Sequence, residues 1–419
     1  MKRLFTTIFV ALVLFVSTAL SNGLNLNSIG VKAGGMGGAF IGLADDYSAI
    51  YWNPAGISNI ENTQVAAYFT GVMPTATYKN SMAHIDATTK AQMFPVPGLM
   101  GYVPITTGVM TLGFGVYIPS GLGTTWDGDE LKNLTGGHSY EWLSQIGVAN
   151  ISPAVSFQLL PTLSVGAAIN LSYGFLDLKK PMGMPNPHDN TKMIFGQYSE
   201  SSSGMGFGAT IGFLFQATNE ISIGASFKTA NKIAFSGTAK NDLVKAALRE
   251  HYKDADLERD ITWPMWIGGG VAVKPINVLT ITADVQYTAW SVLDKMHTTY
   301  KGWEMAKVTE GDMMMNWEDK MQLRFGAEFD AMDMLAIRAG YYLDPAPAPD
   351  ETVNILFPSI NYAGPTFGFA LKFTDLTVEA SVEYLSGTER TITTQTEDNM
   401  SGVHNMNIFS FFVGFVLEF

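Results

Sequence analysis

Apolar and polar residues alternate with a period of two along most of this chain of 419 residues. In residues 279–288, every odd position is apolar and every even position holds Thr, Asp or Gln. The same alternation runs through residues 322–330 and 377–384. Because successive side chains of a strand point to opposite faces, each stretch predicts a β-strand with one apolar and one polar face.

Fourteen such strands are predicted, and the connections between them alternate between short and long. The strands cover residues 64–72, 98–104, 108–118, 148–160, 163–178, 204–217, 221–235, 264–274, 278–290, 321–331, 335–343, 361–373, 376–385 and 408–419. Short turns are expected near 105–107, 161–162, 218–220, 275–277, 332–334 and 374–375, and long connections near 73–97, 119–147, 179–203, 236–262, 291–320, 344–360 and 386–407. In an up-and-down sheet, all the short turns then lie at one end, together with both termini.

A membrane barrel accounts for these patterns, whereas a soluble sandwich would bury its apolar face against a second sheet and would not sort its loops by length. Strands of about 10 residues, tilted by about 40°, match an apolar band about 25 Å tall. Closure pairs every strand edge, as hydrocarbon requires. The sequence therefore predicts an all-β fold: a fourteen-stranded antiparallel transmembrane β-barrel over residues 61–419, with long extracellular loops, in the lipid of a Gram-negative outer membrane.

The two ends of the chain carry signals of their own. Lys2 and Arg3 precede an apolar stretch from residue 4 to residue 20, and small residues follow at Ala19 and Ser21, so residues 1–21 are predicted to be a cleaved signal peptide. A retained anchor helix is the alternative, although 17 residues are at the short limit for a bilayer.

At the carboxy-terminal end of the chain, one face of the last strand is apolar and ends with a terminal Phe. This pattern resembles the signal read by the outer-membrane assembly machinery, and its members are Phe409, Phe411, Val413, Phe415, Leu417 and Phe419.

Composition narrows the function. Lys plus Arg number 25 and Asp plus Glu number 38, a net charge of −13, which argues against nucleic acid as a partner. The chain has no cysteine, which excludes disulfides, thiolate metal sites and Cys nucleophiles. No cofactor or metal site is expected. An outer-membrane lipase is disfavoured because no Gly-x-Ser-x-Gly motif is present and all six histidines are predicted to lie in long connections. A general porin and a structural surface barrel stay open as alternatives.

Residues 22–60 do not alternate. They contain the glycine-rich run 33–40, with no preceding apolar strand and no following Lys-Ser/Thr, which disfavours a phosphate-binding loop. Glycine lets one backbone approach another closely, as a segment threaded through a barrel would require. We therefore expect residues 22–60 to form a hatch in the barrel lumen.

This stretch resembles the amino-terminal hatch of the outer-membrane long-chain fatty acid transporter family (FadL-like), which also includes importers of aromatic hydrocarbons. The matching motifs occur in order at Gly23–Asn25, Gly34–Ala39, Ala44–Asp46 and Asn53–Ala55. Trp290, the stretch 343–347 and the terminal Phe also sit where the family has counterparts. The resemblance covers almost all of the mature chain.

The resemblance implies a passive uptake channel, and by default a monomer, that moves hydrophobic molecules such as long-chain fatty acids or aromatic hydrocarbons. It implies an outer capture groove, an inner pocket, and a kink in the third strand that opens the wall sideways. Gly113 and Gly115 are the candidate bulge and gate residues there, although small residues facing a packed hatch would explain them equally well. In the loops, the candidate capture residues are Trp126, Leu131, Leu134, Trp142, Leu143, Met184 and Phe195, with loop-on-loop packing as the alternative.

The candidate binding residues of hatch and lumen are Leu24, Leu26, Phe40, Asn53, Pro54, Ala55, Arg324 and Arg338. By alternation, the lumen-facing charges are Asp284, Arg324, Glu328, Arg338, Glu379 and Glu383, and salt bridges within the wall would account for most of them. Arg324 and Arg338 are the best candidates for pairing with a substrate carboxylate, because Arg binds carboxylates in a forked geometry. If the substrate is an uncharged hydrocarbon, this role disappears.

Overall fold

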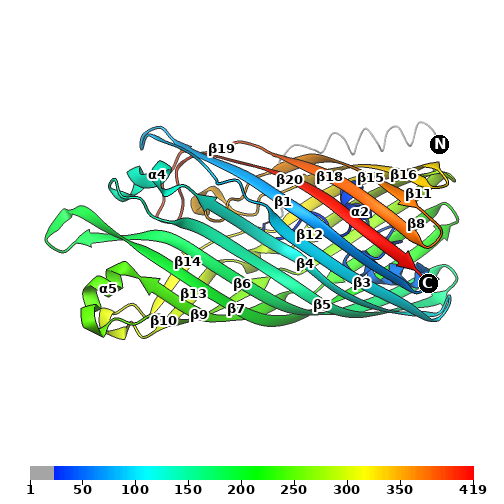
Figure 1. Ribbon diagram of the computed structural model, residues 1–419, viewed down its shortest axis with the longest axis horizontal. Helices are drawn as coiled ribbons and strands as arrows, with labels where there is room; N and C mark the ends of the chain where they lie inside the picture. The colour runs from blue at the N-terminus through cyan, green and yellow to red at the C-terminus, as the bar shows by residue number, and fades with distance from the viewer. Residues whose placement is uncertain (1–22) are drawn as a thin grey trace.

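A computed structural model describes residues 23–419, so the predicted signal peptide lies outside the described residues. The described chain forms a closed antiparallel barrel of fourteen strands, as predicted (Figure 1). Around the barrel, the order is β1 (Gln64–Asn80), β3 (Phe94–Thr106), β4 (Met110–Trp126), β5 (Trp142–Leu160), β6 (Leu163–Asn186), β7 (Asp189–Thr218), β8 (Ile221–Lys228), β11 (Trp266–Ile276), β12 (Leu279–Thr288), β15 (Lys320–Met332), β16 (Leu335–Asp344), β17 (Tyr362–Lys372), β18 (Leu376–Gly387) and β20 (Gly402–Glu418). The last strand closes on the first from Gln64↔Glu418 to Lys79↔Val403.

Short turns join the strands at the end of the barrel that holds the C-terminus, at the six places predicted (Figure 1). At the other end, further elements extend the wall. These are β2 (Ile85–Thr88), β9 (Asn231–Asn241), β10 (Ala255–Trp263), β13 (Lys295–Lys301), β14 (Glu310–Met314), β19 (Arg390–Ile392), α4 (Gly128–Leu131), α5 (Asp242–Leu248) and the 3-10 turns η2 (Lys132–Thr135), η3 (Arg249–His251), η4 (Trp290–Val292), η5 (Glu304–Ala306) and η6 (Asp350–Thr352). Among residues 23–419, no helix has both the length and the apolar character to cross a bilayer.

Two sequence-based expectations about these connections are wrong. The long loop predicted at 179–203 is a hairpin, because β6 and β7 run on past the membrane and protrude at the far left of Figure 1. Some of its inward positions are polar, which weakens the alternation: Glu200 accepts two hydrogen bonds, of 2.7 and 2.9 Å, from Arg259 on β10. Two of the six histidines also lie on strands, His297 on β13 and His404 on β20.

The two faces of the wall differ as the alternation predicts. Along β20, Phe409, Val413, Phe415, Leu417 and Phe419 point outward and are exposed on the barrel surface. The six predicted lumen-facing charges are all buried inside: Asp284, Arg324, Glu328, Arg338, Glu379 and Glu383. The wall therefore presents apolar side chains to lipid and encloses its charges.

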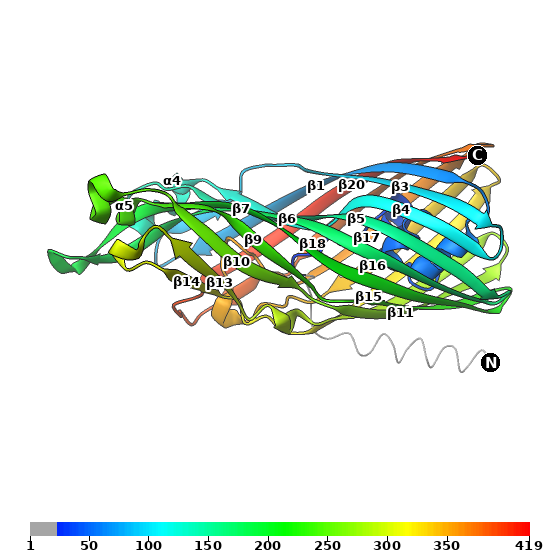
Figure 2. The same cartoon turned by 90° about the horizontal axis from the view of Figure 1, so that it is seen from below.

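Residues 23–60 lie within the lumen as α2 (Val31–Gly35), α3 (Ala49–Trp52) and η1 (Pro54–Asn59). Figure 1 labels α2 inside the ring of strands, and Figure 2 shows the dark-blue beginning of the described chain inside the same ring. We call residues 23–60 the inner segment. It touches the wall backbone to backbone at glycines: a β-carbon on Gly224 would lie 2.0 Å from the carbonyl oxygen of Ile41, and one on Gly340 would lie 2.2 Å from the amide of Gly37. Glycine is therefore required where segment and wall meet.

Buried ion pairs also hold the inner segment. The Nζ of Lys32 lies 2.9 Å from Glu328 on β15 and 3.0 Å from Asp45 of its own segment. Glu328 also forms an ion pair with Arg338 of β16, whose Nε lies 2.7 Å away, and Arg338 pairs in turn with Glu379 on β18. One chain of charges thus joins the inner segment to three strands of the wall.

The candidate substrate cavity and the break in the wall

The regular pairing of β4 breaks at Ile118 and Pro119. Tyr117 pairs with Asn150 of β5, but the next pair is Ser120 with Val148, so β4 carries one extra residue there. This is a β-bulge, and it reverses which positions face inward: Tyr117 is buried before it, Ser120 after it. The bulge lies on the third strand of the barrel, as expected, but not at the predicted residues. Gly113 and Gly115 keep regular partners on both β3 and β5.

Next to the bulge, β3 and β4 are not paired. Their register runs from Thr106↔Met110 to Leu99↔Val116 and stops, so Phe94–Gly98 of β3 pair with β1 alone. Contact resumes beyond the gap, where the amide of Lys90 donates to the carbonyl of Thr125 at 2.7 Å. Pro95 and Pro97 lie in the unpaired stretch, and proline lacks the amide that a paired strand uses. We call the stretch between 94–98 and 117–123 the wall gap.

On the lumen side, the inner segment takes the place of β3 along β4. The amide of Leu26 donates to the carbonyl of Pro119 at 3.0 Å, and the amide of Gly121 donates to the carbonyl of Leu24 at 2.9 Å. Asn25 forms a bridge with Ser120 between these two bonds. The edge of β4 is thus hydrogen-bonded to a short strand-like piece that is not part of the barrel.

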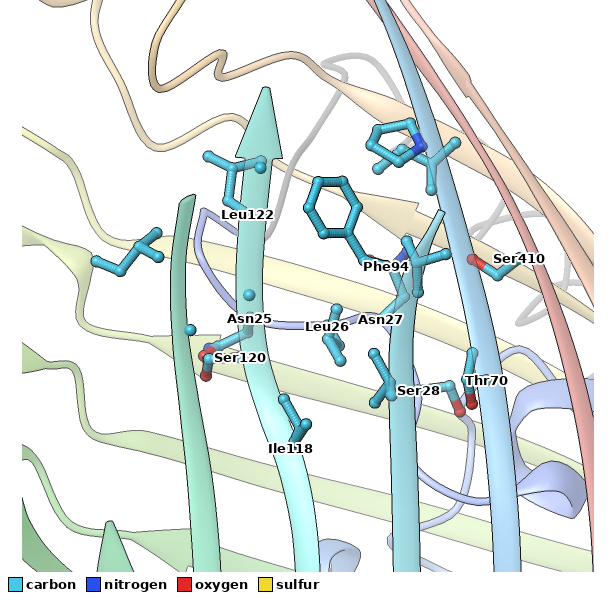
Figure 3. Close-up of a pocket in the computed structure, with 18 of the residues that line it drawn as sticks. Asn25, Leu26, Asn27, Ser28, Thr70, Phe94, Ile118, Ser120, Leu122 and Ser410 are labelled. Carbon is cyan, nitrogen blue, oxygen red and sulfur yellow. The ribbon is translucent and has the colours of Figure 1, made fainter. Parts of the chain in front are cut away.

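A cavity of about 340 Å³ lies directly behind the wall gap, within the usual range of roughly 300–1,000 Å³ for ligand pockets. We call it the large cavity. Its apolar lining includes Leu26, Phe94, Val96, Ile118 and Leu122, and its polar lining includes Asp344 and Glu383. Figure 3 shows Leu26, Phe94, Ile118 and Leu122 around one space between β4 and the end of β3. The arrangement offers an apolar chamber beside the one stretch of the described β3–β4 seam that has no backbone pairing.

Of the predicted residues of the inner segment, Leu26 lines the large cavity. Leu24 is buried in the apolar cluster of the extracellular half, and Phe40 lies within the core that the inner segment forms with the wall. Asn53 connects the backbone of the inner segment to that of the wall, because its Nδ2 donates to the carbonyls of Ile41 and of Phe213 on β7, at 2.9 Å each. Pro54 and Ala55 are buried near wall glycines Gly166 and Gly212.

The two predicted arginines do not line the large cavity. Arg338 is engaged with Glu328 and Glu379. Arg324 lies beneath the inner segment, where its Nη1 donates to the carbonyl of Asn27 at 2.7 Å and its guanidinium sits 4.2 Å from the ring centre of Tyr342. Arg324 therefore holds the inner segment to the wall, whereas Arg338 joins β16 to the carboxylates of β15 and β18 within the wall.

The predicted capture residues divide into two groups. Trp126, Leu131 and Trp142 are buried in one apolar cluster at the extracellular end, against which Leu134 packs. The Nε1 of Trp126 donates to the carbonyl of Ile355 at 3.0 Å, so this group packs loop against loop. Met184, Phe195 and Leu143 lie apart from that cluster and retain surface exposure on β5 and the β6–β7 hairpin.

Sequence reasoning missed Phe94, Val96, Ile118 and Leu122, because Phe94, Val96 and Leu122 were assigned to long loops and Ile118 to the last position of a strand. The three prolines at 95, 97 and 119 were the available signal, because proline in a sheet marks an edge or a bulge.

Comparison with known proteins fits this architecture. The family model described as "Outer membrane protein transport protein (OMPP1/FadL/TodX)" matches residues 12–410. The chain belongs to this family. Members of the OMPP1/FadL/TodX family are outer-membrane transport proteins, and the chain is accordingly an outer-membrane β-barrel.

Individual relatives resemble the chain over nearly its full length. The "Long-chain fatty acid transport protein" of Escherichia coli strain K12 is 22% identical over 92% of this chain and 93% of the relative. That of Salmonella typhi is 23% identical with the same coverage.

Among solved structures, a FadL homologue from Pseudomonas aeruginosa superposes with a TM-score of 0.82 at 14% identity, covering 95% of this chain and all of the other. The toluene transporter TodX of P. putida gives 0.76 at 17% identity, covering 94% and 99%. These structures share the fold.

Proposed function

We propose that this chain is a passive outer-membrane uptake channel for hydrophobic molecules, long-chain fatty acids above all. The observation that carries the proposal is the position of the large cavity, an apolar chamber behind the unpaired stretch of β3 and β4. A substrate held there leaves sideways into lipid without crossing the polar lumen. Each buried CH₂ is worth about 0.8 kcal/mol, so partitioning alone drives a long chain along this route.

The other parts take the roles that the family resemblance implies. The extracellular loops and the exposed apolar residues of the β6–β7 hairpin make first contact with substrate. The inner segment closes the lumen, and its hydrogen bonds to Pro119 and Gly121 set the state of the wall gap. The outward apolar row of β20 serves as the signal for the assembly machinery, and a single barrel is the functional unit.

Transport measurements test the proposal. The chain is expressed in a Gram-negative host that lacks its own long-chain fatty acid transporter, and uptake of a radiolabelled sixteen-carbon fatty acid is compared with uptake of toluene. We expect the fatty acid to accumulate several-fold above the host background. Uptake of toluene alone would favour the aromatic-hydrocarbon alternative within the same family.

A second measurement separates this channel from a porin. Liposomes that contain the purified protein are placed in sugar solutions, and swelling is recorded. We expect no swelling above that of empty liposomes, because the inner segment fills the lumen. Rapid swelling together with absent fatty acid uptake would overturn the proposal.

A further inference from the structure

The large cavity has two chemically different sides. Ile118 and Leu122 belong to its apolar side, which faces the wall gap. Figure 3 draws Ser28, Thr70 and Ser410 across the space from these two residues. We call this second side the polar wall, and its residues are Asn27, Ser28, Thr70, Glu383 and Ser410. A ligand that fills the cavity must therefore combine a polar group with an apolar body.

Strand register brings the residues of the polar wall together. On β20, Ser410 pairs with Glu383 of β18 on one side and with Val72 of β1 on the other. Thr70 lies two residues before Val72 and therefore faces the same way. Asn27 donates to Glu383 at 3.1 Å, which brings the inner segment against the same strands. The polar wall is thus one surface, built by three strands and the inner segment.

Two hydroxyls of the polar wall lack hydrogen-bond partners. The side-chain oxygens of Ser28 and Thr70 are buried and form no hydrogen bond within residues 23–419. The two residues are only 6% and 2% exposed. Tyr362 also lines the large cavity, and its buried hydroxyl has no partner among the same residues. Because leaving a buried hydroxyl unsatisfied costs free energy, three such groups at one cavity point to a ligand that bonds with them.

Glu383 offers an acceptor at the same place. Its Oε1 accepts from Asn27 at 3.1 Å and from Ser410 at 3.3 Å. Its Oε2 accepts no hydrogen bond from any residue that the structure describes. The carboxylate is therefore held in place through one oxygen, and its other oxygen is available to a ligand that donates a hydrogen bond.

The charges around the cavity limit what that ligand can be. The described lining includes Asp344 and Glu383 and has no Lys, Arg or His. An anionic group on the polar wall would therefore meet two carboxylates and no cation. A cationic group would be attracted, but it would carry its charge into hydrocarbon on leaving through the wall gap, at high cost. An uncharged hydroxyl meets neither obstacle, because it both donates and accepts hydrogen bonds.

We propose that the polar wall is a recognition site for the hydroxyl of a neutral long-chain alcohol. The ligand hydroxyl donates to the Glu383 Oε2 and accepts from Thr70 or Ser28, whose hydroxyls turn between staggered positions. The carbon chain of the alcohol lies against Ile118 and Leu122. This inference rests on the proposed function, because the large cavity must hold substrate, and it goes beyond it by adding alcohols to fatty acids, which place only their tails there.

Binding measurements on the purified full-length protein in a neutral detergent test this inference. The probes are 1-hexadecanol and its methyl ether, which share a sixteen-carbon chain and an acceptor oxygen, whereas only the alcohol has an O–H donor. We expect the native protein to bind the alcohol roughly tenfold more tightly, as for a hydrogen bond to a charged group. Glu383→Met should remove this preference. Equal binding of the two probes by the native protein would refute the site, as would a preference that persists in Glu383→Met.

The hydroxyl of Thr70 is tested separately. Thr70→Val should weaken binding of both probes by roughly threefold to tenfold, because both probes have an oxygen that accepts from Thr70. Thr282→Val is the matched control, since Thr282 on β12 also has a buried hydroxyl without a described partner but does not line the large cavity. The control should bind both probes as the native protein does. If Thr70→Val binds no more weakly than Thr282→Val, Thr70 does not contact the ligand and the site is refuted.

Three further results also decide the matter. Should Glu383→Met fail to fold, a reduced preference in Glu383→Gln would support the site, because a neutral acceptor bonds more weakly, and an unchanged preference would refute it. If hexadecylamine binds more tightly than hexadecanol and Glu383→Gln removes that advantage, the site takes a cation and the proposal is wrong. If the native protein binds neither hexadecanol nor palmitate, the proposed function fails as well, whereas binding of palmitate alone refutes only the alcohol site.

Discussion

The ring of Phe94 lies against the backbone of Gly123 across the wall gap: a β-carbon added to Gly123 would be 2.3 Å from the Phe94 Cζ. Phe94 comes from β3 and Gly123 from β4, whose backbones are unpaired at this height. Figure 3 shows the Phe94 ring in the space between the two strands. A side chain therefore closes the seam that backbone hydrogen bonds leave open.

A single thiol at this position tests whether the seam is used. Because the chain has no cysteine, Phe94→Cys introduces one reactive group. We expect Phe94→Cys to take up fatty acid, and a bulky methanethiosulfonate adduct to reduce uptake to the host background until a reductant removes it. Val103→Cys, on the paired and lipid-facing part of β3, is the control. Equal uptake by the Phe94→Cys variant with and without the adduct would show that substrate does not pass here.

The hydrogen bond from Leu26 to Pro119 tests the coupling between the inner segment and β4. Leu26→Pro removes the amide donor, and Leu26→Ala keeps it while shortening the side chain. We expect Leu26→Pro to lower the local free energy of opening by about 1 kcal/mol, so that the Gly121 amide exchanges with deuterium roughly fivefold faster. Unchanged exchange at Gly121 in Leu26→Pro would mean that this bond does not hold the segment.

The buried ion pair between Lys32 and Glu328 predicts that substitutions at these two residues are not additive in their effect on the free energy of unfolding. Lys32→Met leaves Glu328 with Arg338 but removes one of its two cations, and Glu328→Gln leaves Lys32 and Arg338 short of an acceptor. Breaking a buried pair costs about 3–5 kcal/mol, whereas replacing both partners costs less than the sum. Thermal unfolding of the two single variants and the double variant measures this coupling. Simple additivity would contradict a direct Lys32–Glu328 interaction.

Asp46 makes the inner segment sensitive to pH. Burial raises the pKa of Asp46 to about 7, and the nearby carboxylates of Glu379 and Asp45 add to that rise. Because the pKa in the folded chain exceeds the ordinary value of 3.8, the folded state holds the proton more tightly. The stability of the segment should therefore fall as pH rises from about 4 to about 7, with a slope of at most about 1.4 kcal/mol per pH unit.

Hydrogen exchange of the amides in residues 44–52, at pH 5 and pH 8 after correction for intrinsic rates, measures this effect. Asp46→Asn keeps an acceptor for the amide and hydroxyl of Ser48, at 2.7 and 2.6 Å, and has no proton to lose. It should remove the pH dependence. A native protein whose protection is equal at both pH values would contradict a proton on Asp46.

The barrel was predictable because its information is local. The alternation along 279–288 and 377–384 predicts that these residues form strands, which face each side chain occupies, and which charged residues point into the lumen. It does so without reference to any other part of the chain. The β6–β7 hairpin was not predictable in this way. Its inward Glu200 is satisfied by Arg259, which lies 59 residues further along, so the polar face has no local signature.

The residues of the candidate site also divide into those with a local sequence signal and those without one. Proline at 95, 97 and 119 carried a readable signal. Gly113 and Gly115 left two interpretations open, a bulge and close packing against the inner segment, and their regular pairing on both sides excludes the bulge at these residues. Arg324 and Arg338 illustrate the converse. Their inward orientation and the salt bridges within the wall were readable from the sequence, and Arg338 confirms the latter, but the specific partners Asn27, Glu328 and Glu379 were not.

The route itself is tested most directly by a fatty acid that carries a photoreactive diazirine near the end of its tail. The purified protein is loaded, irradiated and digested, and the modified residues are located by mass spectrometry. We predict labels on the lining of the large cavity and the wall gap, at Leu26, Val96 and Ile118. Labels found only on the outer, lipid-facing rows of the strands, with none in the large cavity, would contradict uptake through the interior and out by this seam.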